Sequence, residues 1–165
     1  MNDPRTISVR LADEADTDRL GRALAGSLPE RALVTLTGPL GAGKTRLVRA
    51  IAAAVGVPPT DVTSPTFVLC HEYQGDRAIV HIDGYRLAGG AELLAIGFDE
   101  YLRADGWTLL EWPSRVASAL PPDRYDVELA ATGDTERLVT LRGLGRVSDR
   151  PLHAIRNAGL ERPGP

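Results

Sequence analysis

The sequence of 165 residues is poor in several residue types, and each scarcity excludes a class of protein. Cys70 is the single cysteine, so no internal disulfide can form and a reducing compartment is expected. The opening residues, MNDPRTISVR, contain no apolar segment of the kind that a secretory signal needs. No apolar run approaches the roughly 18 residues that a membrane span requires. We therefore expect a cytoplasmic protein that does not enter a membrane.

The basic residues are also unevenly used. Lysine occurs once, at position 44, and the other 18 of the 19 basic residues are arginine. The formal net charge is −3, which argues against a protein that binds nucleic acid unaided through a basic face. The charge does not exclude contact with RNA as part of a larger assembly.

Hydrophobic periodicity predicts alternating strands and helices. Strands are expected where apolar residues alternate or run together, over 6–11, 31–37, 66–73, 77–83, 107–112, 125–132 and 136–143. Helices are expected over 12–28, 44–55 and, in one or two pieces broken at Gly97, 89–105. This order predicts an α/β fold: a mostly parallel sheet flanked by helices, with antiparallel edge strands and a C-terminal hairpin.

A domain division follows from the same pattern. Residues 1–142 are expected to form one domain, and residues 143–165 a tail that is rich in arginine, glycine and proline. Within the tail, 151–160 could form a short helix, and the last residues are expected to be loose.

Gly38 to Thr45 form the strongest motif in the chain. They read GPLGAGKT and fit the phosphate-binding loop G-x-x-x-x-G-K-[ST] at every fixed position. Glycines let successive backbone N–H groups surround a phosphate, and the following helix directs its positive end at the same point. The lysine reaches the β- and γ-phosphates, and the threonine hydroxyl binds Mg²⁺. The motif thus predicts a site for a nucleoside triphosphate and Mg²⁺, held by Leu40, Gly41, Ala42, Gly43, Lys44, Thr45 and Arg46.

This loop gives the lone lysine a physical reason. Lysine is a compact charge on a flexible stem, whereas arginine is a planar fork too wide to fold back inside the loop. Arginine has taken every other basic position, so its absence at position 44 indicates that it fails there.

Two carboxylates end predicted strands and are candidates for the second Mg²⁺ ligand. Asp83 closes IVHID and Glu111 closes TLLE, and the carboxyl ends of parallel strands lie at the edge where the loop also lies. The alternative is that each carboxylate caps a helix or meets water. His81 lies on the same strand face as Asp83 and is expected to pack or to support the site. Trp107 and Trp112 are expected in the core.

A hydroxyl-rich segment, VTSPTF, follows the loop by about twenty residues. Ser64, Pro65 and Thr66 are candidates for a switch that senses the γ-phosphate. A plain turn is the alternative.

Taken together, these motifs resemble the TsaE family of small P-loop ATPases. The resemblance rests on GPLGAGKT, SPTF at 64–67, HIDGYRL at 81–87, ELLAIG at 92–97, EWP at 111–113 and Leu120-Pro121. It implies an ATPase that acts with TsaB-like and TsaD-like partners in threonylcarbamoyl transfer to adenosine 37 of tRNA. It also implies catalytic or metal roles for Lys44, Thr45, Asp83 and Glu111. Glu14 and Arg137 are similar, more loosely, to residues near the nucleotide.

The chain departs from the family pattern at Pro39, Arg46 and Gly84, where Asp, Thr and Leu are usual. Three other functions remain open. "IDGYR" is also typical of a small nucleotide kinase, which needs an arginine-rich lid. A GTPase would normally carry N-K-x-D, but no second lysine exists. A module could also bind ATP only to dock a partner.

Overall fold

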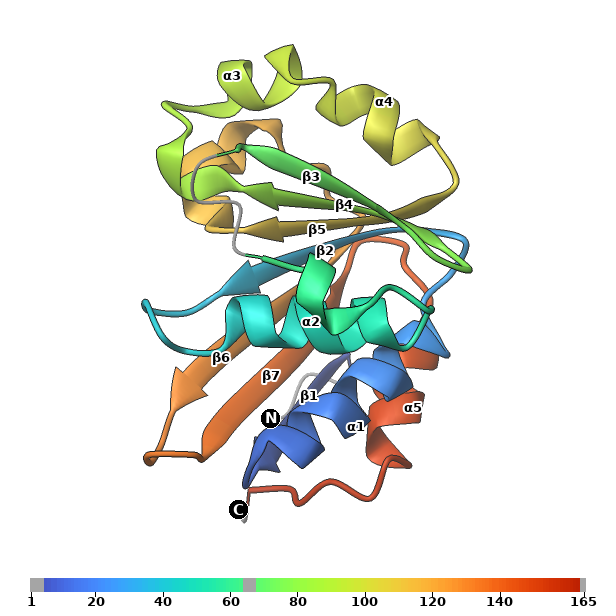
Figure 1. The fold of residues 1–165 in the computed structure, drawn as a ribbon, viewed down its shortest axis with the longest axis vertical. Helices are drawn as coiled ribbons and strands as arrows, with labels where there is room; N and C mark the ends of the chain where they lie inside the picture. Colours follow the sequence, from blue (N-terminus) through green and yellow to red (C-terminus); the bar gives the residue numbers. More distant parts are fainter. Residues whose placement is uncertain (1–4, 64–67, 164–165) are drawn as a thin grey trace.

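The computed structural model describes residues 5–63 and 68–163 (Figure 1). A single seven-stranded sheet runs through the molecule in the order β1-β7-β6-β2-β5-β4-β3. The strands are β1 (Thr6–Leu11), β2 (Arg31–Thr37), β3 (Cys70–Gln74), β4 (Ala78–Asp83), β5 (Gly106–Glu111), β6 (Arg124–Ala131) and β7 (Arg137–Leu144). The helices are α1 (Glu14–Ala25), α2 (Lys44–Ala53), α3 (Gly90–Ala95), α4 (Phe98–Arg103) and α5 (Arg150–Arg156). Three short 3-10 helices complete the described elements: η1 (Pro59–Asp61), η2 (Gly84–Arg86) and η3 (Pro113–Ala119).

The sheet is mixed. Its four central strands, β6, β2, β5 and β4, pair in parallel, whereas β3 pairs with β4, β7 with β6 and β1 with β7 in antiparallel fashion. The predicted C-terminal hairpin and the antiparallel strand at the start of the chain are therefore confirmed. Because β2, β4 and β5 are parallel, their carboxyl ends meet at one edge of the sheet, where the segments after them can converge.

Helices cover both faces of the sheet (Figure 1). On one face, α1, α2 and α5 pack on a core that includes Leu20, Leu47 and Ile155. On the other face, Phe98 of α4 packs in a second cluster with Leu87 and Val116. The middle of β2 and nearly all of β5 are buried because helices cover both faces of these strands.

The segment after residue 142 belongs to this packing. Strand β7 continues to Leu144, and α5 buries Leu152 and Ile155 in the larger core. Beyond the helix, Arg10 forms a β-bridge with Glu161. The expected short helix is thus present, and it packs on the same core as α1. Within the described part of the chain, no helix combines the length and apolar character needed to cross a membrane.

Candidate functional site

The loop from Gly38 to Thr45 joins β2 to α2 and depends on its glycines. Gly41 and Gly43 have φ values of +80° and +103°, which side chains rarely adopt. Gly43 lies directly before α2, and no side chain caps the N-terminus of that helix. The first N–H groups of α2 are consequently directed at the space above the loop, as an anion site requires.

Lys44 lies inside this loop with 5% of its surface exposed. Its Nζ donates to the carbonyl oxygens of Gly38 at 2.6 Å and Pro39 at 3.0 Å. It also lies 4.1 Å from the centre of the Trp112 ring. Burial lowers the pKa of Lys44, and the negative charges of Glu111 and Asp83 partly oppose that shift.

The two predicted carboxylates lie side by side. Asp83 and Glu111 are register partners at the ends of the parallel strands β4 and β5, and both are buried. Glu111 Oε1 accepts a 2.8 Å hydrogen bond from Thr45 Oγ1, which joins β5 to the loop. Asp83 Oδ1 accepts from the backbone N–H of Tyr85 at 2.9 Å. Burial raises the pKa of Asp83, and the nearby charge of Glu111 raises it further.

A third buried polar residue belongs to this group. His81, two residues before Asp83 in β4, is fully buried, and its Nε2 lies 2.8 Å from Glu111 Oε1. The sequence pattern placed His81 on the Asp83 face of the strand, yet its side chain contacts Glu111 on the neighbouring strand.

Gly84 explains how the two strand ends come so close. A Cβ atom at this position would lie 2.8 Å from the Trp112 carbonyl oxygen and 2.9 Å from that of Glu111. A side chain at Gly84 would therefore push the ends of β4 and β5 apart. The absence of a side chain at this position allows the backbone after β4 to lie against the end of β5.

A cavity of about 410 Å³ lies over the loop. It is lined by Leu40, Gly41, Gly43, Lys44, Thr45, Arg46, Asp83, Tyr85, Glu111 and Trp112. Among residues 5–63 and 68–163, no three His, Cys, Asp or Glu side chains could hold a metal by themselves. The donor set fits Mg²⁺ nonetheless, because this ion takes oxygen ligands and is usually held by one or two carboxylates together with substrate phosphates.

The other predicted nucleotide contacts surround the loop from outside. Arg46 lines the cavity, but its guanidinium is held 2.7 Å from Asp18 and 3.8 Å from Glu14 on α1. Arg137 donates from Nε to the Ala42 carbonyl oxygen at 3.1 Å. Glu14 pairs with Arg46, Ala42 is buried within the loop, and Arg137 contacts Ala42; none of these three predicted residues lines the cavity. The proposed switch residues Ser64, Pro65 and Thr66 lie outside the described residues.

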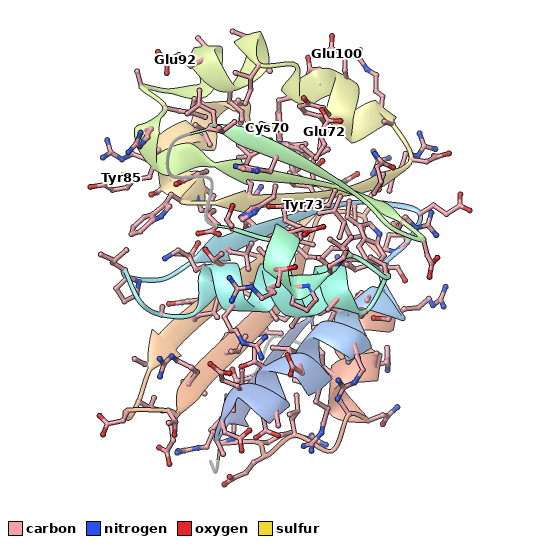
Figure 2. All side chains as sticks on the ribbon, in the orientation of Figure 1. Cys70, Glu72, Tyr73, Tyr85, Glu92 and Glu100 are labelled. Carbon is pink, nitrogen blue, oxygen red and sulfur yellow. The ribbon has the colours of Figure 1, made fainter. Side chains whose placement is uncertain are left out.

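Trp112 corrects one expectation. Trp107 is buried in the core as expected, whereas Trp112 lines the cavity and packs its ring against Tyr85 at 5.1 Å. Trp112 has a φ of 59°, a left-handed conformation that is uncommon for an aromatic residue. Figure 2 shows Tyr85 projecting at the edge of the molecule where β4 and β5 end. The unusual backbone turns Trp112 out of the sheet, which apolar periodicity does not reveal.

Comparison with known proteins gives a consistent result. Residues 11–139 match the family described as threonylcarbamoyl adenosine biosynthesis protein TsaE. The tRNA threonylcarbamoyladenosine biosynthesis protein TsaE of Treponema pallidum is 37% identical, over 76% of this chain and 93% of that protein. Its namesake in Streptomyces coelicolor is 42% identical, over 76% and 89%. The crystal structure of Bacillus subtilis YdiB superposes with a TM-score of 0.74 at 26% identity, over 96% of this chain and 97% of that one.

Proposed function

The chain belongs to the TsaE family of threonylcarbamoyladenosine biosynthesis, and on that premise we propose that it is a Mg²⁺-dependent ATPase with a P-loop fold. It would act in the cytoplasm as an accessory subunit with TsaB-like and TsaD-like proteins, supporting threonylcarbamoyl transfer to adenosine 37 of tRNA. Its contact with tRNA would be indirect.

One observation carries the ATPase proposal: Thr45 and Glu111 meet at 2.8 Å between the loop and the end of β5. This places a hydroxyl of the phosphate-binding motif beside a buried carboxylate, at the rim of a cavity that also contains Lys44 and Asp83. In P-loop NTPases the ion is held by the loop hydroxyl and by a carboxylate at the end of a neighbouring strand.

Each residue then has a defined role. The N–H groups of Gly41 to Thr45 would surround the phosphates of a bound nucleotide, and Lys44 would supply the positive charge that holds their oxygens. Thr45 and Glu111 would hold Mg²⁺ together with Asp83, and the ion would supply positive charge to neutralise the charge that develops on the phosphates. Glu111 would also orient the attacking water, because its carboxylate oxygens can accept hydrogen bonds.

A small nucleotide kinase is the second candidate, since Asp83 to Arg86 match part of a kinase pattern. Such an enzyme closes an arginine-rich lid over the phosphates. Here Arg46 is the single arginine among the described residues that line the cavity, and Asp18 and Glu14 hold its guanidinium. This charge distribution favours hydrolysis over phosphoryl transfer to a second nucleotide.

The test is reconstituted tRNA modification with and without this protein, using wild type and Glu111→Ala. We expect ATP turnover and multiple rounds of modification to require the wild-type chain together with both partners. Phosphoryl transfer to nucleoside monophosphates by the chain alone would support the kinase instead. Modification that proceeds equally well without the chain would refute the proposed role.

A further inference from the structure

The Glu111 carboxylate is held from two sides through the same oxygen. Oε1 accepts from Thr45 Oγ1 at 2.8 Å and contacts His81 Nε2 at 2.8 Å. Among the described residues, no hydrogen bond reaches Oε2. Two donors on one oxygen fix the rotation of the carboxylate about its last bond. The lone pairs of Oε2 are thereby left available on a residue that lines the cavity.

The surroundings of His81 fix its ring and its proton. The imidazole is fully buried, and the ring centroid of Tyr73 lies 6.2 Å away. Its Nδ1 has no hydrogen-bond partner among residues 5–63 and 68–163. A proton on Nδ1 would therefore be a buried N–H without an acceptor, which is costly. The favoured tautomer carries its proton on Nε2 and donates it to Glu111.

We propose that His81 is a positioning residue for Glu111: its Nε2–H holds the carboxylate in the orientation that receives Mg²⁺ and the attacking water. This inference rests on the proposed ATPase function and assigns to it a residue that touches neither nucleotide nor metal. Partners that orient a metal-ligating side chain from behind typically change metal affinity or activity by about 10–100-fold when they are removed.

Two amide side chains of different length separate this role from simple core packing. His81→Gln can present an amide N–H near the position of Nε2, whereas His81→Asn is equally polar but presents it near Nδ1, too far from Glu111. His81→Leu fills the space without any donor. Thermal unfolding of each variant verifies that it folds, and the Gln and Asn pair preserves the test if the leucine variant does not.

The readout is ATP affinity of the full-length chain by titration calorimetry, with EDTA and with excess Mg²⁺. We expect the increase in ATP affinity that Mg²⁺ gives to be about 10–100-fold smaller in His81→Asn than in the wild type. Its ATP affinity in EDTA should be unchanged. We expect His81→Gln to retain most of that increase. ATP turnover with the partner proteins should follow the same order.

Equal behaviour of the Gln and Asn variants would overturn the proposal, as would an equal loss of affinity with and without Mg²⁺. Either result would make His81 a core residue. Both leave the ATPase function standing as long as the wild-type chain binds ATP and turns it over with its partners. A wild-type chain that binds no ATP would instead refute the proposed function, and this inference with it.

Discussion

The Glu111 side chain is expected to contribute both to ATP turnover and to the stability of the fold, and two substitutions at this position distinguish the two contributions. In Glu111→Ala, Thr45 and His81 lose their shared acceptor. Thr45 borders the cavity, so water can replace that acceptor, whereas His81 is fully buried. Leaving one buried donor unsatisfied costs about 1–3 kcal/mol. We therefore expect the free energy of unfolding to fall by about that amount.

Glu111→Gln is the matched variant. Its amide oxygen can still accept from Thr45 and His81, so the loss of unfolding free energy should be smaller than in the alanine variant. Its charge is gone, however, and a neutral amide is a poor ligand for Mg²⁺ beside the phosphates. ATP turnover should therefore fall in both variants by at least about 100-fold, the upper end of the loss seen when an outer-shell partner is removed.

The assays are urea unfolding of the isolated chain, ATP binding by calorimetry and steady-state turnover with both partner proteins. ATP binding without Mg²⁺ should largely survive in both variants, because Lys44 and the backbone of the loop remain, whereas the increase in ATP affinity that Mg²⁺ gives should fall at least as far as in His81→Asn. Turnover by Glu111→Gln close to the wild-type value would refute the reasoning, since the carboxylate would then be needed only as a hydrogen-bond acceptor.

Three further predictions test other parts of the structure. Lys44→Arg should weaken ATP binding at least about tenfold, about 1.4 kcal/mol, because a planar fork cannot fit between the Gly38 carbonyl and the Trp112 ring; wild-type affinity in calorimetry would contradict this. Burial raises the folded-state pKa of Asp83, so the folded protein favours the protonated carboxyl group. The contribution of this group to the free energy of unfolding is full below the unfolded-state pKa and is lost as the pH rises through the folded-state pKa. Without nucleotide or Mg²⁺, the stability of Asp83→Asn relative to wild type should therefore increase from acid to neutral pH in urea unfolding; a constant difference would exclude the shift. Gly21→Ala should lower the free energy of unfolding by about 1–2 kcal/mol despite the better helix propensity of alanine, since its Cβ would lie 2.6 Å from that of Ala50; a gain would show that α1 and α2 can separate.

Local patterns predicted most of the fold because its elements carry strong local signals. The continuous apolar run of 31–37 becomes the buried central strand β2, and Gly133 lies in the turn of the β6–β7 hairpin. Of the strand predicted over 66–73, the structure describes residues 68–73, and the strand there is Cys70–Gln74. The turn in η3 after Pro113 was also missed, since a short 3-10 helix carries no periodic signal.

The site was predictable to the extent that its residues belong to contiguous motifs. The loop motif and the strand-terminal positions of Asp83 and Glu111 located the cavity, because parallel strands bring their carboxyl ends together. What the sequence could not give is the direction of side chains across strands. The pairing of His81 with Glu111 depends on the register of β4 against β5.

Arg46 is a second residue whose side-chain direction could not be predicted from the sequence. The motif predicts a phosphate contact at this position, and the residue does line the cavity. Its guanidinium is nevertheless held by Asp18 and Glu14, two acidic residues of α1 that lie far from the loop in sequence. Arginine has the length to reach α1 while its backbone stays in the first turn of α2, which the threonine usual at this position lacks. This departure from the family pattern therefore turns the Arg46 side chain toward the first helix, where it pairs with Asp18 at 2.7 Å.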